Sequence, residues 1–234
     1  MPKVRVNDIA MNYEVQGEGE PLVLIGGLGT DISVYGRMVR QFSEKYRVLV
    51  FDNRGVGFTD KPDIPYTIEM MADDTAGLMA ALGIGKAHVL GISLGGRIAM
   101  ALALRHPDRV MKLVLTATFA SQPPNKLPRS YHAVKRITAL AAPFRKKAQP
   151  YYAFVRQLEA SRGFVCADRL GDIGTPTLIL HGLKDSIAPF HLAEELHSGI
   201  KGSTLISFPG GHAFTLMQRE RFLREVSAFL SGTV

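Results

Sequence analysis

The chain has 234 residues, 46% of them hydrophobic and 21% charged, with a net charge of +7 at pH 7. This length suits one domain with a sizeable core, and the composition is that of a soluble globular protein. No stretch approaches the roughly 18 uncharged apolar residues that a membrane span needs, so the sequence argues against a membrane-spanning protein.

The first half of the chain alternates apolar runs with helical patterns, which predicts a mostly parallel α/β sheet. Its first two strands are joined by the turn residues Asn7 and Asp8 and are expected to form an antiparallel hairpin. The predicted strands cover residues 3–6, 11–16, 21–25, 47–51, 87–90 and 111–116. The predicted helices cover residues 34–44, 67–82 and 97–106.

The periodicity breaks between residues 119 and 168, where only two weak helical patterns remain, near 131–142 and 150–161. We interpret this stretch as a short helical lid inserted into a core made of residues 1–118 and 169–234. Strands over 175–180 and 203–208 and one amphipathic helix over 214–230 complete the predicted core. The sequence therefore predicts a single α/β domain of eight strands with one insertion.

The basic residues are concentrated in this insertion. Residues 121–168 contain nine Lys or Arg and two acids, whereas the rest of the chain has nineteen of each. Charge confined to one segment, with no recognition motif, argues against a nucleic-acid-binding protein. Two interpretations remain open: a solvated helical surface, or attraction of an anionic substrate or an anionic lipid surface.

Ser93 stands between two glycines, in Gly-Ile-Ser-Leu-Gly at 91–95, where a predicted strand turns into a predicted helix. This pattern is typical of a nucleophile elbow, in which Gly91 and Gly95 avoid clashes in a tight turn. The helix N-terminus also favours negative charge that develops nearby. The alternative is a glycine-rich loop in which Ser93 only caps the helix.

A serine nucleophile needs a base and a group that orients the base. His212 lies in the glycine-containing loop between the last strand and the last helix, whereas His191 and His197 lie in a polar helical run. Asp185 follows the strand that ends at His181, and loops at strand carboxyl ends carry ligand-facing residues. We therefore favour Asp185 over Asp172, which precedes that strand.

The backbone N–H of Leu94, directly after the serine, is the first candidate donor to an oxyanion. The loop Gly-Gly-Leu-Gly at 26–29 offers a second, the N–H of Leu28. This loop lacks the spacing of a nucleotide-binding motif, and no residue cluster has metal-ligand spacing, so we predict no cofactor and no metal. Asp52 and Arg54 are interpreted as a structural pair, with Arg54 fixing the loop around Asp52.

Six motifs occur in the order found in one large family. They are Gly-Gly-Leu-Gly at 26–29, Asp-Asn-Arg-Gly-Val-Gly at 52–57, Gly-Ile-Ser-Leu-Gly-Gly at 91–96, His-Pro-Asp-Arg-Val at 106–110, His-Gly-Leu-Lys-Asp at 181–185 and Gly-Gly-His at 210–212. On these residues the chain resembles α/β-hydrolase-fold enzymes over nearly its full length. The family commonly has His-Gly at the first motif, and here Gly26 stands where that histidine would be.

The resemblance implies a serine hydrolase with Ser93 as nucleophile, His212 as base and Asp185 as its orienter. Within the family the chain is similar to small carboxylesterases, enol-lactonases and perhydrolases, and Ser93 argues against relatives that use an aspartate nucleophile. We expect a small ester or lactone substrate, with C–C bond hydrolysis of a ring-fission product or ligand binding without catalysis as alternatives.

Aromatic residues of the insertion are expected either to line a substrate pocket or to pack the lid onto the core. Phe119, Phe144 and Tyr152 are our candidate pocket residues. Cys166 is the single cysteine, so an internal disulfide is excluded, which agrees with a cytoplasmic location. We see no signal peptide, and the sequence does not set the oligomeric state.

Overall fold

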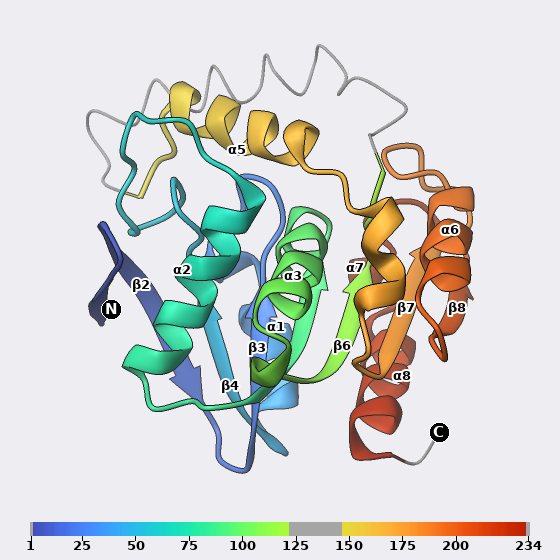
Figure 1. Cartoon of the computed structure of the whole chain (residues 1–234). Helices are drawn as coiled ribbons and strands as arrows, with labels where there is room; N and C mark the ends of the chain where they lie inside the picture. Colours follow the sequence, from blue (N-terminus) through green and yellow to red (C-terminus); the bar gives the residue numbers. More distant parts are fainter. Residues whose placement is uncertain (1, 122–146, 233–234) are drawn as a thin grey trace.

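The computed structural model describes residues 2–121 and 147–232. Within them the strands form one eight-stranded sheet in the order β1-β2-β4-β3-β5-β6-β7-β8 (Figure 1). The strands are β1 (Lys3–Val6), β2 (Ile9–Gln16), β3 (Glu20–Ile25), β4 (Tyr46–Phe51), β5 (Ala87–Ile92), β6 (Val110–Thr116), β7 (Thr177–Gly182) and β8 (Thr204–Phe208). Only β2 runs against its neighbours. The predicted mostly parallel α/β sheet is confirmed.

Helices follow or connect most of these strands. They are α1 (Gly36–Phe42), α2 (Ile68–Ala81), α3 (Leu94–Arg105), α5 (Tyr151–Gly163), α6 (His191–Gly199), α7 (Phe214–Met217) and α8 (Arg219–Ser231), with short 3₁₀ turns at Ile32–Val34, Pro107–Arg109 and Ala167–Asp172. The hydroxyl of Thr67 accepts a hydrogen bond from the N–H of Met70 and caps α2 as predicted. In the described part of the chain, no helix combines the length and apolarity needed to cross a membrane.

The prediction of one continuous helix over 214–230 is wrong, because the chain forms α7 and α8 there. Gln218, between the two helices, leaves the helical region with φ of −121° and ψ of 42°. Its side-chain amide donates to the carbonyl of Pro209 instead. The amphipathic pattern survives this break, because Phe222, Val226 and Leu230 of α8 are all buried. The helical pattern predicted near 131–142 lies outside the described residues.

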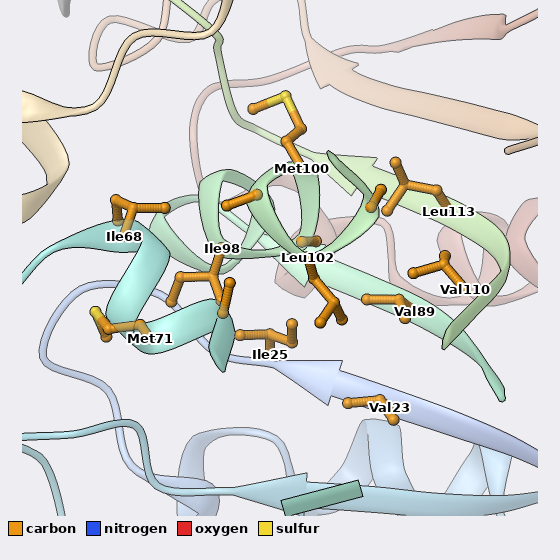
Figure 2. Packing of buried hydrophobic residues seen from close by; sticks show 14 of the residues in the cluster. Val23, Ile25, Ile68, Met71, Val89, Ile98, Met100, Leu102, Val110 and Leu113 are labelled. Atoms are coloured by element: carbon orange, nitrogen blue, oxygen red, sulfur yellow. The ribbon is translucent and has the colours of Figure 1, made fainter. Parts of the chain in front are cut away.

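Alternate residues of the parallel strands face two separate apolar layers, as expected for a sheet that is covered on both faces. Val23, Val89 and Leu113 pack against α2 and α3, as Figure 2 shows. Their chain neighbours Leu24, Leu90 and Val114 belong to the opposite layer, with α1 and α8. These strand residues are fully buried, so the sheet is a rigid platform for the residues at its edges.

Asp52 and Arg54 are both buried and structural, but the predicted contact between them is replaced by two separate networks. Arg54 pairs with Asp74 at 2.8 Å and with Asp8 at 2.6 Å. Asp52 accepts hydrogen bonds from Asn12 and from two backbone N–H groups. Both networks fix the loop that follows β4.

The strands β5, β7 and β8 are parallel, so their carboxyl ends meet at one edge of the sheet. Each is followed by a turn or loop that leads into a helix, namely α3, α6 and α7, respectively. Helix α5 lies across this same edge (Figure 1). The fold therefore gathers three loops, distant in sequence, beneath one helix of the insertion.

Candidate active site

Ser93 occupies the turn between β5 and α3 in a strained backbone conformation, with φ of 56° and ψ of −115°. Non-glycine residues rarely adopt a positive φ, and such strain persists only where surrounding contacts enforce it. Here the N–H of Ser93 donates to Thr116 O at 2.8 Å, and the hydroxyl of Thr118 donates to Ser93 O at 2.9 Å. Hydrogen bonds from the end of β6 and the residues after it therefore stabilise the strained backbone of Ser93.

The two glycines of the motif are required by close backbone approach. A Cβ atom on Gly91 would lie 2.4 Å from the carbonyl oxygen of Gly95. A Cβ atom on Gly95 would lie 2.0 Å from the carbonyl oxygen of Ile25. The two glycines are thus needed because the first turn of α3 packs closely against β5 and β3. If Ser93 only capped the helix, this close packing would not be required. No side-chain capping bond from Ser93 is present.

The structure brings Ser93, Asp185 and His212 into one hydrogen-bonded chain. His212 Nε2 lies 2.9 Å from Ser93 Oγ, and His212 Nδ1 lies 2.7 Å from Asp185 Oδ2. The three residues follow β5, β7 and β8, respectively. This geometry allows the imidazole to take a proton from the serine hydroxyl while the carboxylate holds its other nitrogen.

Asp185 is held in one orientation by the turn that carries it. Its Oδ1 accepts hydrogen bonds from the N–H groups of Ile187 and Ala188, both at 2.9 Å. Burial alone would raise the pKa of the Asp185 carboxyl, but the hydrogen bond from His212 and those from the backbone outweigh burial and lower it. The carboxylate therefore stays ionised at neutral pH.

His181 lies close to this carboxylate but is bound elsewhere. It is fully buried, and its Nε2 lies 2.7 Å from Ala188 O and 3.5 Å from Asp185 Oδ2. Burial lowers the pKa of His181, which keeps the ring neutral. It therefore holds the Asp185 turn. Asp172, the alternative acid, is exposed and pairs with Arg169 before β7.

Leu28 and Leu94 line one cavity of about 260 Å³ together with Ser93 and His212. The N–H of Leu94 belongs to the first turn of α3, where backbone donors have no acceptor within the helix. Within the described residues, the N–H of Leu28 has no hydrogen-bond acceptor either. Two backbone donors are thus available on the cavity side of the serine, which suits an oxyanion at a tetrahedral centre.

Two side chains that sequence reasoning missed hold the loop at 26–30. The hydroxyl of Tyr35 accepts a hydrogen bond from the N–H of Gly27 at 2.8 Å. On the other side, Gln157 of α5 is fully buried, accepts from the N–H of Gly29 at 3.0 Å and donates to Arg54 O at 2.7 Å. No local pattern could have identified the Gln157 contact, because Gln157 lies 128 residues from Gly29.

The cavity wall is mostly apolar. Besides the residues above, it is lined by Val34, Ile92, Phe119, Leu158, Ile187, Ala213 and Leu216, with polar positions at Thr30, Ser161 and Thr215. Phe119 therefore lies at the cavity, as predicted. Tyr152 does not line it, because its hydroxyl donates to Lys61 O at 2.7 Å on the outer side of α5. Phe144 lies outside the described residues.

Among the described residues that line the cavity, the Lys or Arg side chains are those of Arg97 and Arg162. Arg97 is buried and donates to the backbone carbonyls of Phe119, Ser121 and Phe164, the last a very close contact. Its guanidinium also stacks 4.3 Å from the Phe119 ring. Burial lowers the pKa of Arg97 to about 10, so the group still carries its charge at neutral pH. Among the described lining residues there is no Asp or Glu.

Among residues 2–121 and 147–232, no group of three or more His, Cys, Asp or Glu side chains has an arrangement that could hold a metal ion. Asp185 is linked to Ser93 through His212. Its Oδ2 is hydrogen-bonded to His212, and its Oδ1 accepts from the N–H groups of Ile187 and Ala188. The site thus brings together a hydroxyl, an imidazole, a carboxylate and two backbone donors, which are groups that nucleophilic acyl transfer can use.

Comparison with known proteins agrees with this geometry. The family described as alpha/beta hydrolase fold matches residues 20–158. The putative carbamate hydrolase RutD of Caulobacter sp. (strain K31) is 30% identical over 94% of this chain and 95% of its own. Both lengths are almost fully covered, so the similarity extends beyond the motifs.

Two solved structures are similar to the whole chain. The enol-lactonase from Burkholderia xenovorans LB400 has a TM-score of 0.88 and 28% identity, and the match covers 98% of this chain and all of that one. The meta-cleavage product hydrolase from Pseudomonas fluorescens IP01 has a TM-score of 0.85 and 27% identity, covering 100% and 98%. All three relatives are named as hydrolases of different kinds, so they agree on the class of reaction and differ in substrate.

Proposed function

The chain belongs to the α/β-hydrolase family, and from this premise we propose that it is a serine hydrolase that cleaves a small carboxylic ester or lactone. The observation that carries the proposal is the chain of two hydrogen bonds, 2.9 and 2.7 Å long, that links Ser93 through His212 to Asp185. The similarity to an enol-lactonase supports the substrate class.

In the proposed mechanism Ser93 Oγ attacks the carbonyl carbon as His212 Nε2 accepts the hydroxyl proton. Asp185 keeps the proton on Nδ1 and stabilises the imidazolium that forms. The N–H groups of Leu28 and Leu94 donate to the oxyanion of the tetrahedral intermediate. The imidazolium then protonates the leaving oxygen, and water, activated by the same imidazole, releases the acyl group from Ser93.

The decisive experiment is replacement of Ser93 by alanine. We expect S93A to lose labelling by a fluorophosphonate probe and hydrolysis of p-nitrophenyl acetate, because both require the same nucleophile. S43A is a matched control, since the Ser43 hydroxyl only donates to Arg40 O on the surface. Labelling that persists in S93A would overturn the proposal, as would its loss in S43A.

We further propose that the substrate carries a negative charge. Arg97 and Arg162 line the cavity, and no Asp or Glu is among the described residues of its wall. The neighbouring segment 122–146 contains six Lys or Arg and no Asp or Glu, so it has no carboxylate to contribute. Charges in a partly desolvated wall act more strongly than charges in water, so an anionic substrate group is favoured here.

Two esters of equal length test this charge preference: p-nitrophenyl valerate and mono-p-nitrophenyl glutarate, in which a carboxylate replaces the terminal methyl. We expect kcat/KM to favour the glutarate, and R162Q, which removes one of the two Arg cations of the described wall, to reduce that preference about tenfold. R156Q is the control, because Arg156 lies on the same helix but pairs with Glu159 and Asp63 outside the cavity. Equal preference in R162Q and R156Q would contradict this assignment.

The similarity to a meta-cleavage product hydrolase supports a second candidate, hydrolysis of a C–C bond in an acidic ring-fission product. Relative rates on a simple ester, an enol-lactone and a vinylogous ketone separate the two candidates. Tight ligand binding without turnover, in protein that the fluorophosphonate does not label, would instead indicate a binding protein on this scaffold.

We propose that residues 119–168 act as a short lid on a core formed by 1–118 and 169–234. The described part of the insertion supports this division, because α5 contributes Leu158, Ser161 and Arg162 to the cavity wall. We also propose a cytoplasmic location, which suits the free and buried thiol of Cys166.

A further inference from the structure

Gly26 has no side chain, and the structure shows what occupies the space beside it. A Cβ atom on Gly26 would lie 2.8 Å from Tyr35 Cε2, 3.1 Å from the Tyr35 hydroxyl oxygen and 3.2 Å from Thr30 Oγ1. The phenol ring of Tyr35, itself buried, therefore fills the place beside the loop. Any side chain at position 26 would displace it.

Three hydrogen bonds close a ring around Gly27. Its N–H donates to the Tyr35 hydroxyl, the Tyr35 and Thr30 hydroxyl oxygens are 2.8 Å apart, and the Thr30 hydroxyl donates to Gly27 O at 2.8 Å. Since the single proton of Thr30 goes to that carbonyl, the Tyr35 hydroxyl must be the donor to Thr30. Burial raises the pKa of Tyr35, so the phenol keeps the proton that this arrangement requires.

These three hydrogen bonds fix the direction in which the Leu28 N–H points. The peptide between Gly26 and Gly27 is held at both ends, because Asn53 donates to Gly26 O at 3.1 Å while Tyr35 accepts from the Gly27 N–H. In the next peptide, Thr30 holds Gly27 O, and a planar trans peptide points its N–H the opposite way. That N–H is the one on Leu28, at the cavity.

We propose that Tyr35, acting through Thr30, is a positioning residue that aims the Leu28 N–H at the oxyanion. The inference rests on the proposed hydrolase function and adds a residue to it. Tyr35 touches none of the reacting atoms in this role. Its loss should therefore reduce stabilisation of the transition state and leave ground-state binding of the substrate in place.

The test is Y35F, which keeps the ring over Gly26 and removes only the hydroxyl. Loss of a whole oxyanion donor costs about 10²–10³ in kcat, so a misdirected donor should cost about tenfold to hundredfold. We expect KM for p-nitrophenyl valerate to stay within about twofold, and the inhibition constant of an alkyl trifluoromethyl ketone to rise by the same factor as kcat falls.

Y66F is the matched control. Tyr66 is equally buried, and its hydroxyl donates to a backbone carbonyl, that of Pro62, at 2.7 Å, but it does not line the cavity. A general effect of removing a buried phenol hydroxyl would appear in both variants. Retention of kcat in Y35F to within twofold of Y66F, or a loss confined to KM, would overturn the proposal.

A second pair of variants tests the occupied space directly. G26A should lower kcat as Y35F does, because its Cβ displaces the Tyr35 ring, whereas G85A, with no atom within 4 Å of the added Cβ, should not. The kcat of the double variant G26A/Y35F should fall no further than that of the more impaired single variant. Both substitutions remove the same hydrogen bonds of the Tyr35 hydroxyl, so their effects should not add. Additive losses would contradict this account.

Two outcomes separate this inference from the proposed function. Hydrolysis that persists in S93A would remove the proposed function itself, whatever Y35F does. Hydrolysis that is lost in S93A but unchanged in Y35F and G26A would remove only the role of Tyr35. If circular dichroism shows that Y35F does not fold, T30V takes its place, because it breaks the same set of hydrogen bonds around Gly27. Its control is T30S, which keeps the hydroxyl and should retain kcat.

Discussion

Replacing Asp185 by asparagine tests the orientation of the imidazole without changing the size of the side chain. The two backbone N–H groups at 2.9 Å need an acceptor, so the asparagine oxygen takes the place of Oδ1. Its NH₂ group then faces His212 Nδ1 at about the 2.7 Å now spanned by Oδ2. Nδ1 must become an acceptor, which moves the ring proton to Nε2, beside Ser93. An Nε2 that carries a proton cannot act as the base.

The magnitude follows from two competing arrangements. The wrong tautomer in a serine triad costs about 10⁴ in kcat, or about 5.4 kcal/mol in the activation barrier. A flipped asparagine amide would restore the tautomer but leave two buried N–H groups without acceptors, at about 1–3 kcal/mol each. The flip therefore limits the loss, and we expect D185N to retain between about 10⁻² and 10⁻⁴ of the wild-type kcat.

The assay is steady-state hydrolysis of p-nitrophenyl valerate, with the rate of fluorophosphonate labelling as a second measure of Ser93 reactivity. D172N is the matched control, because Asp172 is exposed and lies at the opposite end of β7. A D185N enzyme within threefold of wild type, or an equal loss in D172N, would refute the reasoning.

The same variant has a predictable pH dependence of stability. The pKa of Asp185 is lowered in the folded state, so the carboxylate stabilises the fold above its unfolded pKa of about 3.9, and this stabilisation is lost as the pH falls through the folded pKa. The difference in unfolding free energy between wild type and D185N should therefore have its largest value at pH 7 and decrease below about pH 4. A difference that grows on acidification would contradict the direction of the shift.

Three further outcomes concern the scaffold. Burial raises the pKa of Cys166 to about 11, so a disulfide reagent at pH 8 should react with it only after denaturant is added; rapid reaction of the native protein would be contrary evidence. R54M should cost about 3–5 kcal/mol in urea unfolding, because it leaves the buried Asp74 carboxylate without its cation; a loss below 1 kcal/mol would contradict this. G95A should lower the melting temperature and abolish activity, because its Cβ would lie 2.0 Å from the Ile25 carbonyl oxygen, and an unchanged melting temperature would disprove the clash.

The sequence predicted those parts of the site that depend on local chain geometry. Ser93 was identifiable because a strand, a tight turn and a helix leave their marks within a few residues. Asp185 and His212 were identifiable because each follows a predicted strand, and parallel strands end at one edge. Their meeting needed no knowledge of side-chain packing, only the sheet topology, which the alternation of apolar runs and helices already indicated.

Contacts between distant segments were not predictable in this way. Tyr35, directly before α1, and Gln157, in α5, both reach the loop at 26–30, and neither residue type nor spacing marks them as partners of a backbone N–H. Tyr152 failed as a lining residue because the rotation of α5 turns it toward Lys61, and a weak amphipathic pattern does not fix that rotation. The break at Gln218 likewise depends on an acceptor, Pro209 O, supplied by the preceding loop.

Different parts of the fold are proposed to serve the reaction and to select the substrate, which explains why relatives with different substrates resemble this chain to a similar degree. A carbamate and a lactone differ in leaving group, yet hydrolysis of either passes through a tetrahedral oxyanion. In the proposed mechanism the loops after β3, β5, β7 and β8 serve that shared step, so they would not distinguish the substrates. Under the proposed charge preference, the cavity wall formed by Phe119, Arg97 and the last turn of α5 would distinguish them, because its charge would act on the remote part of the substrate. A substrate search should therefore vary the charge of the acyl group before it varies the bond that is cleaved.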